Sequence, residues 1–171
     1  MYPRKLTNFN LFIDGRSYAG VAEEVTLPPL ERTMEDFRGG GMLGPIKLDM
    51  GLEALQLSFT LAEFNADVLA LWGVEDASGV GARFMGAAQA DNADGTVDAI
   101  EIAVRGRWQK IDPGNAKQGE AAKMSVDMPL TYYKYTLNGS VLIEIDMING
   151  REIVNGEDRT AAIREAIGLP A

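Results

Sequence analysis

Hydrophobic and polar residues alternate along much of the chain, with the period of two that is typical of half-buried strands. The clearest stretch is 55–61, LQLSFTL, in which leucine or phenylalanine occupies every second position. Asp-Gly and Asn-Gly pairs separate several of these stretches and predict tight hairpin turns. The same pattern predicts further strands at 8–14, 80–90, 97–111, 121–137, 141–146 and 151–154.

Two stretches have the periodicity of a helix instead. Residues 64–72 contain Asn65 as a candidate N-cap. Their apolar side chains recur at the spacing of one helix face, at Phe64, Val68, Leu71 and Trp72. Residues 157–170 begin with acidic side chains and reach a stop signal at Gly168. We therefore expect one mostly β (α+β) domain over residues 1–171, with one internal helix and one C-terminal helix.

Residues 30–38, LERTMEDFR, alternate so weakly that neither face suits a hydrophobic core. One face carries Glu31 and Glu35, and the other carries Arg32 and Asp36. The two prolines just before this stretch cannot occupy a central strand, so a corner or a sheet edge is predicted there. A strand of this kind is expected to face water, a partner subunit or a polar lumen.

The glycine-rich stretch 37–45, FRGGGMLGP, fits the spacing G-x-G-x-x-G at Gly39, Gly41 and Gly44. That motif cradles a pyrophosphate only where a helix follows the glycines, because the anion lies at the helix N-terminus. Here the alternating strand 55–61 comes next, without an intervening helix. The glycines therefore favour a mobile loop between two strands over a nucleotide site.

The amino-acid composition excludes several common kinds of catalytic site. The 171 residues include no cysteine and no histidine, which excludes disulfides, zinc sites built on those ligands and a Ser-His-Asp triad. A net charge of −9 argues against a surface that grips DNA or an anionic membrane. No apolar run approaches the ~18 residues of a membrane span, and no secretory signal is evident, so we expect a cytoplasmic chain without membrane insertion.

Acidic residues remain as candidates for chemistry. The turn 91–95, DNADG, resembles a calcium loop, but Ala90 occupies the place of the first ligand, so a hairpin turn is favoured. Glu144 and Asp146 lie at alternate positions of one strand, where carboxylates commonly face solvent without any function. We therefore predict no enzyme and assign no catalytic residue, metal ligand or cofactor.

Several stretches together resemble the major tail tube protein of contractile-tailed phages and of R-type bacteriocins. The matching stretches are LTNFNLFIDG, VTLPPLE with the following GGGM, IKLDMGLEAL, IDPGNAKQGE with PLTYYK, and IEIDMINGREIVNG. Their order and spacing carry the resemblance, which extends from about residue 6 to residue 169. The stretch 80–97 resembles the family least.

The resemblance implies a β-sandwich or barrel subunit whose strands join those of neighbouring subunits in a barrel that lines a tube. Six copies would close into a ring, and rings would stack. Residues 37–50 would form an extended loop or hairpin that reaches the adjacent ring. Its expected contact residues are Phe37, Gly39, Gly40, Gly41, Met42, Leu43 and Ile46.

A tube of this kind implies a channel wall that does not retain DNA. Acidic side chains on the wall would repel the phosphates of a passing duplex. The residues expected to face the lumen are Glu31, Glu35, Glu53 and Asp127.

The resemblance also implies partners and a location. Besides copies of the chain itself, the partners are the tail sheath protein, the baseplate hub, the tape-measure protein and the tail terminator. The chain would be made in the host bacterial cytoplasm and would end in the virion tail or in a phage-tail-like particle. Two alternatives stay open: a type VI-secretion-like tube protein and a soluble small-molecule-binding β-barrel.

Overall fold

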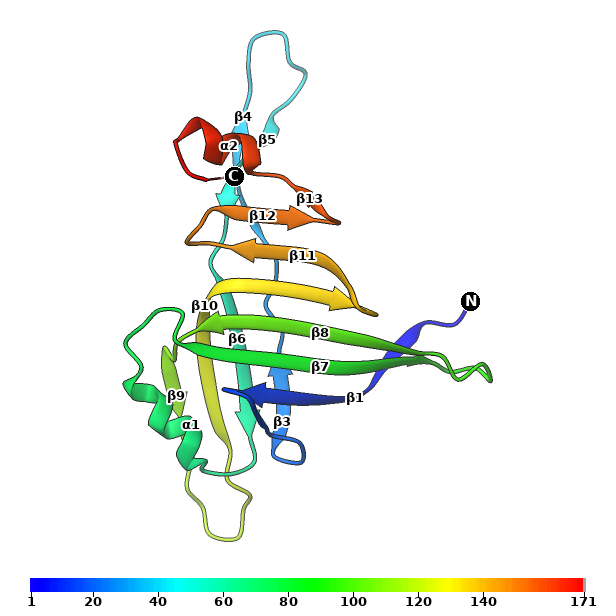
Figure 1. Ribbon diagram of the computed structural model, residues 1–171, viewed down its shortest axis with the longest axis vertical. Coiled ribbons are helices and arrows are strands. Elements are labelled where there is room, and N and C mark those ends of the chain that lie inside the picture. The colour runs from blue at the N-terminus through cyan, green and yellow to red at the C-terminus, as the bar shows by residue number, and fades with distance from the viewer. Residues whose placement is uncertain (171) are drawn as a thin grey trace.

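The computed structural model describes residues 1–170, which form two β-layers that cross each other (Figure 1). The first layer has the strand order β13-β12-β11-β10-β8-β7-β1-β2 and is antiparallel throughout. Its strands are β1 (Arg4–Ile13), β2 (Arg16–Ser17), β7 (Val80–Ala90), β8 (Val97–Gly106), β10 (Met124–Leu137), β11 (Ser140–Asp146), β12 (Arg151–Val154) and β13 (Glu157–Asp158). The mostly β prediction is confirmed.

The second layer consists of β3 (Ala22–Thr26), β6 (Leu55–Leu61), the first half of β10 and β9 (Lys110–Asp112). Strand β10 belongs to both layers. Its residues 124–130 pair with β6, whereas the residues from Leu130 onward pair with β8 and β11. One long strand therefore joins the layers at their crossing.

The predicted strand 97–111 is interrupted in the structure, and this corrects the expectation. Strand β8 ends at Gly106 and β9 begins at Lys110, because the chain passes from the first layer to the second. A Cβ atom on Gly106 would lie 2.1 Å from the carbonyl oxygen of Pro129 on β10. The close approach of the two backbones at this corner thus requires glycine.

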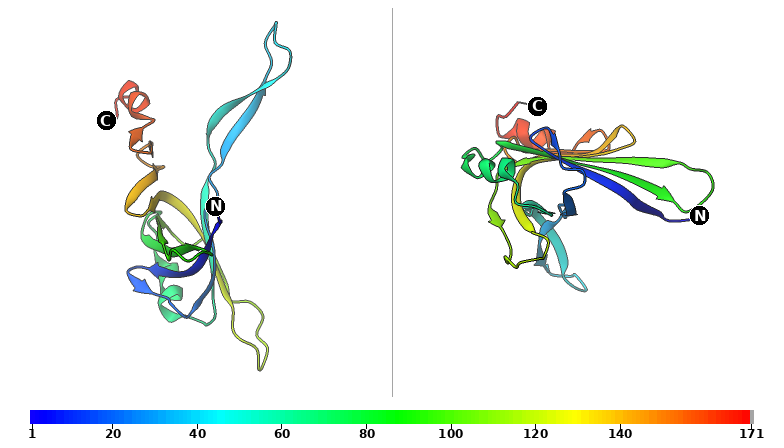
Figure 2. Two further views of the ribbon diagram at one scale, coloured as in Figure 1. Left: turned by 90° about the vertical axis from the view of Figure 1, so that its right-hand side faces the viewer. Right: turned by 90° about the horizontal axis from the view of Figure 1, so that it is seen from below.

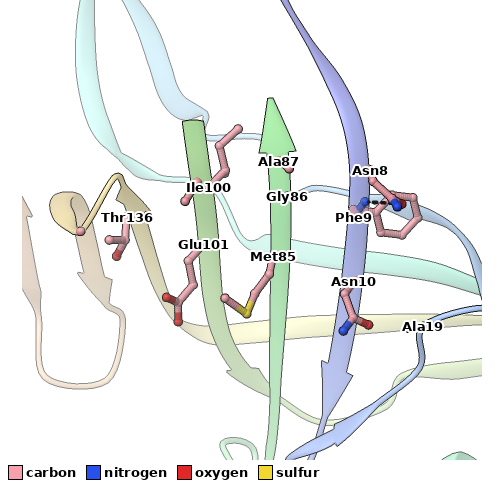
Figure 3. Close-up of a pocket in the computed structure, with 12 residues that line it drawn as sticks. Asn8, Phe9, Asn10, Ala19, Met85, Gly86, Ala87, Ile100, Glu101 and Thr136 are labelled. Atoms are coloured by element: carbon pink, nitrogen blue, oxygen red, sulfur yellow. Dashed lines mark hydrogen bonds between the residues drawn. The ribbon is translucent and has the colours of Figure 1, made fainter. Parts of the chain in front are cut away.

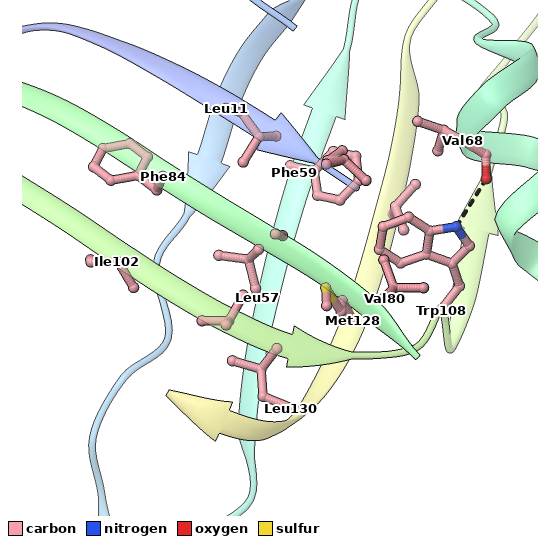
Figure 4. Packing of buried hydrophobic residues seen from close by; sticks show 14 of the residues in the cluster. Leu11, Leu57, Phe59, Val68, Val80, Phe84, Ile102, Trp108, Met128 and Leu130 are labelled. Atoms are coloured by element: carbon pink, nitrogen blue, oxygen red, sulfur yellow. Dashed lines mark hydrogen bonds between the residues drawn. The ribbon is translucent and has the colours of Figure 1, made fainter. Parts of the chain in front are cut away.

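The hydrophobic core lies between the layers (Figure 4). Every second side chain of β6 points into it, as the period-two pattern predicts: Leu55, Leu57, Phe59 and Leu61. Trp108 closes one end of the core. Its indole Nε1 donates a hydrogen bond to the carbonyl oxygen of Val68 at 2.9 Å, and its ring meets Phe59 edge-on at 5.5 Å.

The Asp-Gly and Asn-Gly turns form as the sequence predicts. Asp14, Asn138 and Asn155 have φ values of 50°, 50° and 54°, and each is followed by a glycine of positive φ. Two successive residues of positive φ suit a two-residue hairpin, because their twist matches that of the flanking strands. These turns connect β1 to β2, β10 to β11 and β12 to β13.

Both predicted helices are present and short. Helix α1 (Ala66–Ala70) continues into the 3₁₀ turn η1 (Leu71–Gly73), and the side chain of Asn65 caps its first turn. Helix α2 (Ala161–Ala166) is shorter than the predicted helix 157–170, because the acidic residues expected in its first turn, Glu157 and Asp158, form strand β13 instead. Neither is long and apolar enough to cross a membrane, in the part of the chain that the structure describes.

The apolar face expected for the internal helix is buried only at Val68. Phe64 and Trp72 are 57% and 58% exposed, although their spacing places them on that face. The helical segment therefore packs on the core through Val68 and partly through Leu71, and it presents Phe64 and Trp72 outward.

We predict that Trp108→Phe lowers the free energy of unfolding by about 1–3 kcal/mol, because the buried hydrogen bond from the indole to the carbonyl of Val68 is lost and the smaller ring leaves part of the core unfilled. Denaturant titration of the purified subunit measures this difference. Trp72→Phe is the matched control, since Trp72 is exposed and its loss should change stability by less than about 0.5 kcal/mol. Equal effects of the two substitutions would contradict the role of this hydrogen bond.

Candidate assembly surface

The hairpin of β4 (Arg32–Phe37) and β5 (Ile46–Leu52) projects from the body as a two-stranded sheet of its own (Figure 2). Every residue of β4 is exposed, and so is every residue of β5 before Leu52. The expectation that neither face of this strand is core is therefore confirmed. An isolated two-stranded hairpin is marginally stable in water, so this one gains little from burial within its own subunit.

Charged side chains tie the hairpin to the body at its base. Arg32 donates to Asp49 across the hairpin at 3.1 Å and also forms an ion pair with Glu152 on β12. Nearer the tip, Lys47 and Asp36 approach to 3.1 Å. Exposed pairs of this kind contribute little stability individually, but Arg32 fixes which face of the hairpin is turned toward β12.

The tip of the hairpin contains the glycine-rich loop. Phe37 and Ile46 are the last paired residues of the two strands. Beyond them, the amide of Gly39 donates to the sulfur of Met42 at 3.0 Å, and Gly41 has a φ of 82°. Strand β5 follows the glycines, so this segment has no helix N-terminus that could bind a pyrophosphate.

The predicted contact residues are thus together at the tip, but they are not equally available. Leu43 is fully exposed, whereas Met42 is half-buried because it folds back over Gly39. Phe37 and Ile46 are 50% and 49% exposed and share a face. Together with Gly40 and Gly41, they form an apolar tip with no cover in the described chain.

The acidic residues predicted to line a lumen lie on the side of the molecule away from the core. Thr33 donates to the carboxylate of Glu53 at 2.8 Å, so these side chains share a face of the hairpin. Glu31 and Glu35 lie two positions before and two positions after Thr33 in the same extended segment, so their side chains point to the same face as Thr33. This is the face opposite Arg32, which contacts β12.

Asp127 on β10 belongs to the same surface. Its neighbours Val126 and Met128 point into the core, and its carboxylate accepts a hydrogen bond at 2.8 Å from Ser58 on β6. Leu52 packs against the core cluster, so the hairpin and β6 keep the same core-facing side. The four acids therefore lie on the side away from the core, where exposed Leu48 is registered opposite Glu35 and Lys110 is registered opposite Asp127.

A buried ion pair holds α2 against the end of the first layer. The guanidinium of Arg164 donates to both carboxylate oxygens of Asp158, at 3.1 and 2.5 Å, and to the hydroxyl of Thr160 at 2.7 Å. The Arg164 side chain is only 3% exposed. These hydrogen bonds hold the pKa of Asp158 well below its usual range. Sequence reasoning missed this pair, because a helical arginine ordinarily faces solvent.

The surface of the subunit has several concavities. One of them lies over β1, β7 and β8, and Glu101 is the only ionisable residue of its lining (Figure 3). The space between the two layers is filled with packed side chains. No cluster of three metal-ligating side chains occurs in residues 1–170.

Free strand edges are a second feature that sequence reasoning did not locate. Strand β3 pairs only with β6, and β9 pairs only with β10, among the residues that the structure describes. Each of them borders the second layer, and each leaves one row of backbone donors and acceptors open. Such edges invite pairing with another chain.

The second layer has open strand edges, and the projecting hairpin ends in exposed apolar side chains. Both features are typical of structural proteins that assemble with copies of themselves. Residues 3–168 match the family described as phage tail tube protein FII. The chain belongs to this family, and its role is that of a structural component of a tail tube.

Individual relatives agree with this assignment. The chain is 44% identical over 172 residues to the tail tube protein of Escherichia phage P2, with 98% of each chain covered. It is 36% identical over 149 residues to the major tail tube protein of Serratia phage KSP20, with 86% of this chain and 85% of the relative covered.

Solved structures share the fold at much lower identity. One is the sheath/tube terminator of the extracellular contractile injection system PVC in its extended state, with a TM-score of 0.59, 9% identity, and 80% and 98% of the two chains covered. Another comes from the PVC sheath-tube complex in its extended state, with a TM-score of 0.57, 11% identity, and 79% and 92% covered.

We predict that Asp158→Asn lowers the thermal midpoint of the subunit at pH 7 and that the difference from wild type shrinks progressively as the pH falls below about 4. The pKa of Asp158 is lowered on folding, so its stabilising contribution is present above the unfolded pKa of about 4 and is lost as pH falls through the folded value. Circular dichroism melts between pH 7 and pH 2 measure the effect. Glu165→Gln, an exposed change on the same helix, serves as control; a pH-independent gap for Asp158→Asn would refute the linkage.

Proposed function

We propose that six copies of this chain form a ring and that rings stack into the hollow inner tube of a contractile phage tail or phage-tail-like particle. Residues 1–171 act as one subunit, with 37–50 as its inter-ring segment. The observation that carries the proposal is the projecting hairpin, whose exposed apolar tip has no use in an isolated subunit. The family assignment supports it independently.

Within a ring, the open edge of β3 approaches the open edge of β9 of the next copy. The second layers of all copies then continue into one closed barrel, which removes both open edges of the second layer. The two edges differ, so the contact is heterologous and each copy uses both. A rotation that closes after six copies gives a ring rather than an open chain.

Along the tube, the hairpin of one ring reaches the subunits of the next. Leu43, Phe37 and Ile46 supply apolar surface for this contact, and Gly39, Gly40 and Gly41 allow the backbone to approach closely. Burial of that surface in the adjacent ring gives the hairpin the stabilisation that its own subunit does not provide.

In the barrel wall, the side chains of Glu31, Glu35, Glu53 and Asp127 are directed into the channel. Fixed negative charge in a narrow channel repels phosphates, so DNA passes without being bound. The tube has no enzymatic activity, cofactor or metal in this proposal. Its function is mechanical.

The outer partners follow from the same assembly. The tail sheath protein surrounds the tube, the baseplate hub and the tail terminator contact its two ends, and the tape-measure protein occupies its channel before DNA does. The solved structures that share the fold come from particles described as sheath-tube and terminator assemblies, which supports this arrangement. The chain is made in the host cytoplasm and ends in the tail, without inserting into a membrane.

We predict that Leu43→Asp raises the protein concentration needed for tube assembly by roughly tenfold or more, because a charge replaces the most exposed apolar side chain of the tip. Negative-stain electron microscopy and sedimentation across a concentration series measure the threshold. The subunit should keep its fold by circular dichroism. Met85→Asp, at a side chain 38% exposed on the outer face of β7, is the control. If the variant forms tubes of normal length at the wild-type threshold, the tip is not part of the stacking contact.

Reversal of the acidic face should convert the channel into a DNA-binding surface. Tubes of the Glu31→Lys, Glu35→Lys, Glu53→Lys triple variant, assembled with short DNA duplexes, should hold nuclease-protected DNA that high salt releases. Wild-type tubes should protect none. Glu165→Lys, at an exposed site on α2, controls for a general gain of positive charge. Equal protection by this control, or none by the triple variant, would exclude these acids from the lumen.

A further inference from the structure

The β4–β5 hairpin is attached to the rest of the subunit at its root only (Figure 2). Its two strands continue into the second layer through residues 27–31 and 53–54. Within the root, the amide of Glu53 donates to the carbonyl of Glu31 at 2.9 Å, and this bond joins the two strands of the hairpin to each other. Such bonds hold the hairpin together, but they do not set its angle to the first layer.

One side chain of the root reaches the first layer. The guanidinium of Arg32 donates to Asp49 across the hairpin at 3.1 Å and forms an ion pair with Glu152 on β12. Among residues 1–170, this pair with Glu152 is the only hydrogen bond or ion pair that joins residues 30–52 to the first layer. The polar attachment of the hairpin to β12 therefore depends on Arg32.

Apolar packing beneath Arg32 is incomplete. A concavity of about 150 Å³ separates the root from β11 and β12, and both Arg32 and Glu152 line it. Leu30, at the root, is 43% exposed. Because apolar contacts do not fill this space, they leave the angle of the hairpin free to vary. The apolar part of the lining consists of Leu30, Leu52, Ile143, Ile145 and Val154.

The two carboxylates that hold the guanidinium are themselves fixed. Asp49 accepts a second hydrogen bond, from the amide of Gly51 at 2.9 Å, where the hairpin has a β-bulge and Gly51 a φ of 111°. On β12, the amide of Glu152 donates to the hydroxyl of Thr160 at 3.1 Å, and its carbonyl accepts from the amide of Arg159 at 2.8 Å. The bridge therefore connects two ordered parts of the backbone.

We propose that Arg32, through Glu152, is the positioning residue that orients the hairpin for stacking before the tube assembles. This inference rests on the proposed inter-ring contact. The seven residues of β5 span roughly 23 Å, so a rotation of about 20° at the root moves the tip by about 8 Å. The proposed ring presents six hairpins at once. If each spends half as much time in the binding orientation, the apparent affinity between rings falls about 60-fold.

The orientation is measured on the unassembled subunit. Leu43→Cys at the tip and Val141→Cys on β11 provide the only two cysteines, because the chain has none of its own. Nitroxide labels on both report the tip-to-body distance by pulsed electron paramagnetic resonance, below the assembly threshold. The distance distribution should be narrow in the labelled parent and at least twice as wide with Glu152→Ala. Glu152→Gln keeps an acceptor for Arg32 and should give an intermediate width.

Lys47→Ala is the matched control. It removes an exposed ion pair with Asp36, at 3.1 Å, that lies within the hairpin and does not reach the body. The width of the distribution should not change, because Arg32 still holds the root. Circular dichroism should show the same fold for the control and for both Glu152 variants.

Assembly is measured on the same substitutions without labels, by sedimentation and negative-stain electron microscopy. Glu152→Ala should raise the concentration threshold for tubes at least tenfold, and Lys47→Ala should change it less than twofold. An unchanged distance distribution in Glu152→Ala would overturn the positioning role of Arg32. A wider distribution with an unchanged threshold would show that this orientation does not control stacking. If the distribution widens but the parent chain forms no tubes, the bridge is supported and the proposed tube is not.

Discussion

The structure depends on the register of strand β10. Its first half pairs with β6 and β9, and its second half pairs with β8 and β11, so one strand fixes the crossing of the two layers. The buried side chains of both layers meet across that crossing. A slip of one residue would turn Val126 and Met128 out of the core and Asp127 into it. The same register therefore sets the core and the acidic face.

The surfaces that remain open are consequences of this arrangement. The second layer is narrower than the first, so the ends of β1, β7 and β8 extend past it (Figure 2). Between β3 and β6 the chain forms the β4–β5 hairpin, which projects away from both layers. An isolated subunit has no means of covering these regions, and the open edges of β3 and β9 add unpaired backbone. In the proposed tube, neighbouring copies cover the projecting strand ends and the hairpin and pair with the open edges.

Local features of the fold were predictable from the sequence. The turns at Asp14, Asn138 and Asn155 and the cap at Asn65 depend on residue chemistry within a few positions, and all form. The strand 80–90 matches β7 at both ends. The exposed strand before the glycine loop was recognisable because neither of its faces was apolar. The contacts of the hairpin tip with an adjacent ring and the position of the four acids in a lumen stay predictions.

The remaining features depend on packing at a distance. The break between β8 and β9 arises from the backbone of Pro129, which the local pattern of residues 97–111 cannot reveal. Phe64 and Trp72 have the spacing of a buried helix face and yet are exposed, because periodicity does not say whether the cover comes from the same chain. Arg164 is buried because Asp158 precedes it on a separate strand. Each case requires knowledge of which segments meet.

A helical reconstruction of assembled tubes by electron cryomicroscopy tests the central claim most directly. The account predicts rings of six subunits, with the tip at residues 37–46 in contact with the adjacent ring and the face of Glu31, Glu35, Glu53 and Asp127 lining the channel. Rings in which the tip contacts no neighbouring subunit, or tubes with this acidic face on the outside, would contradict it.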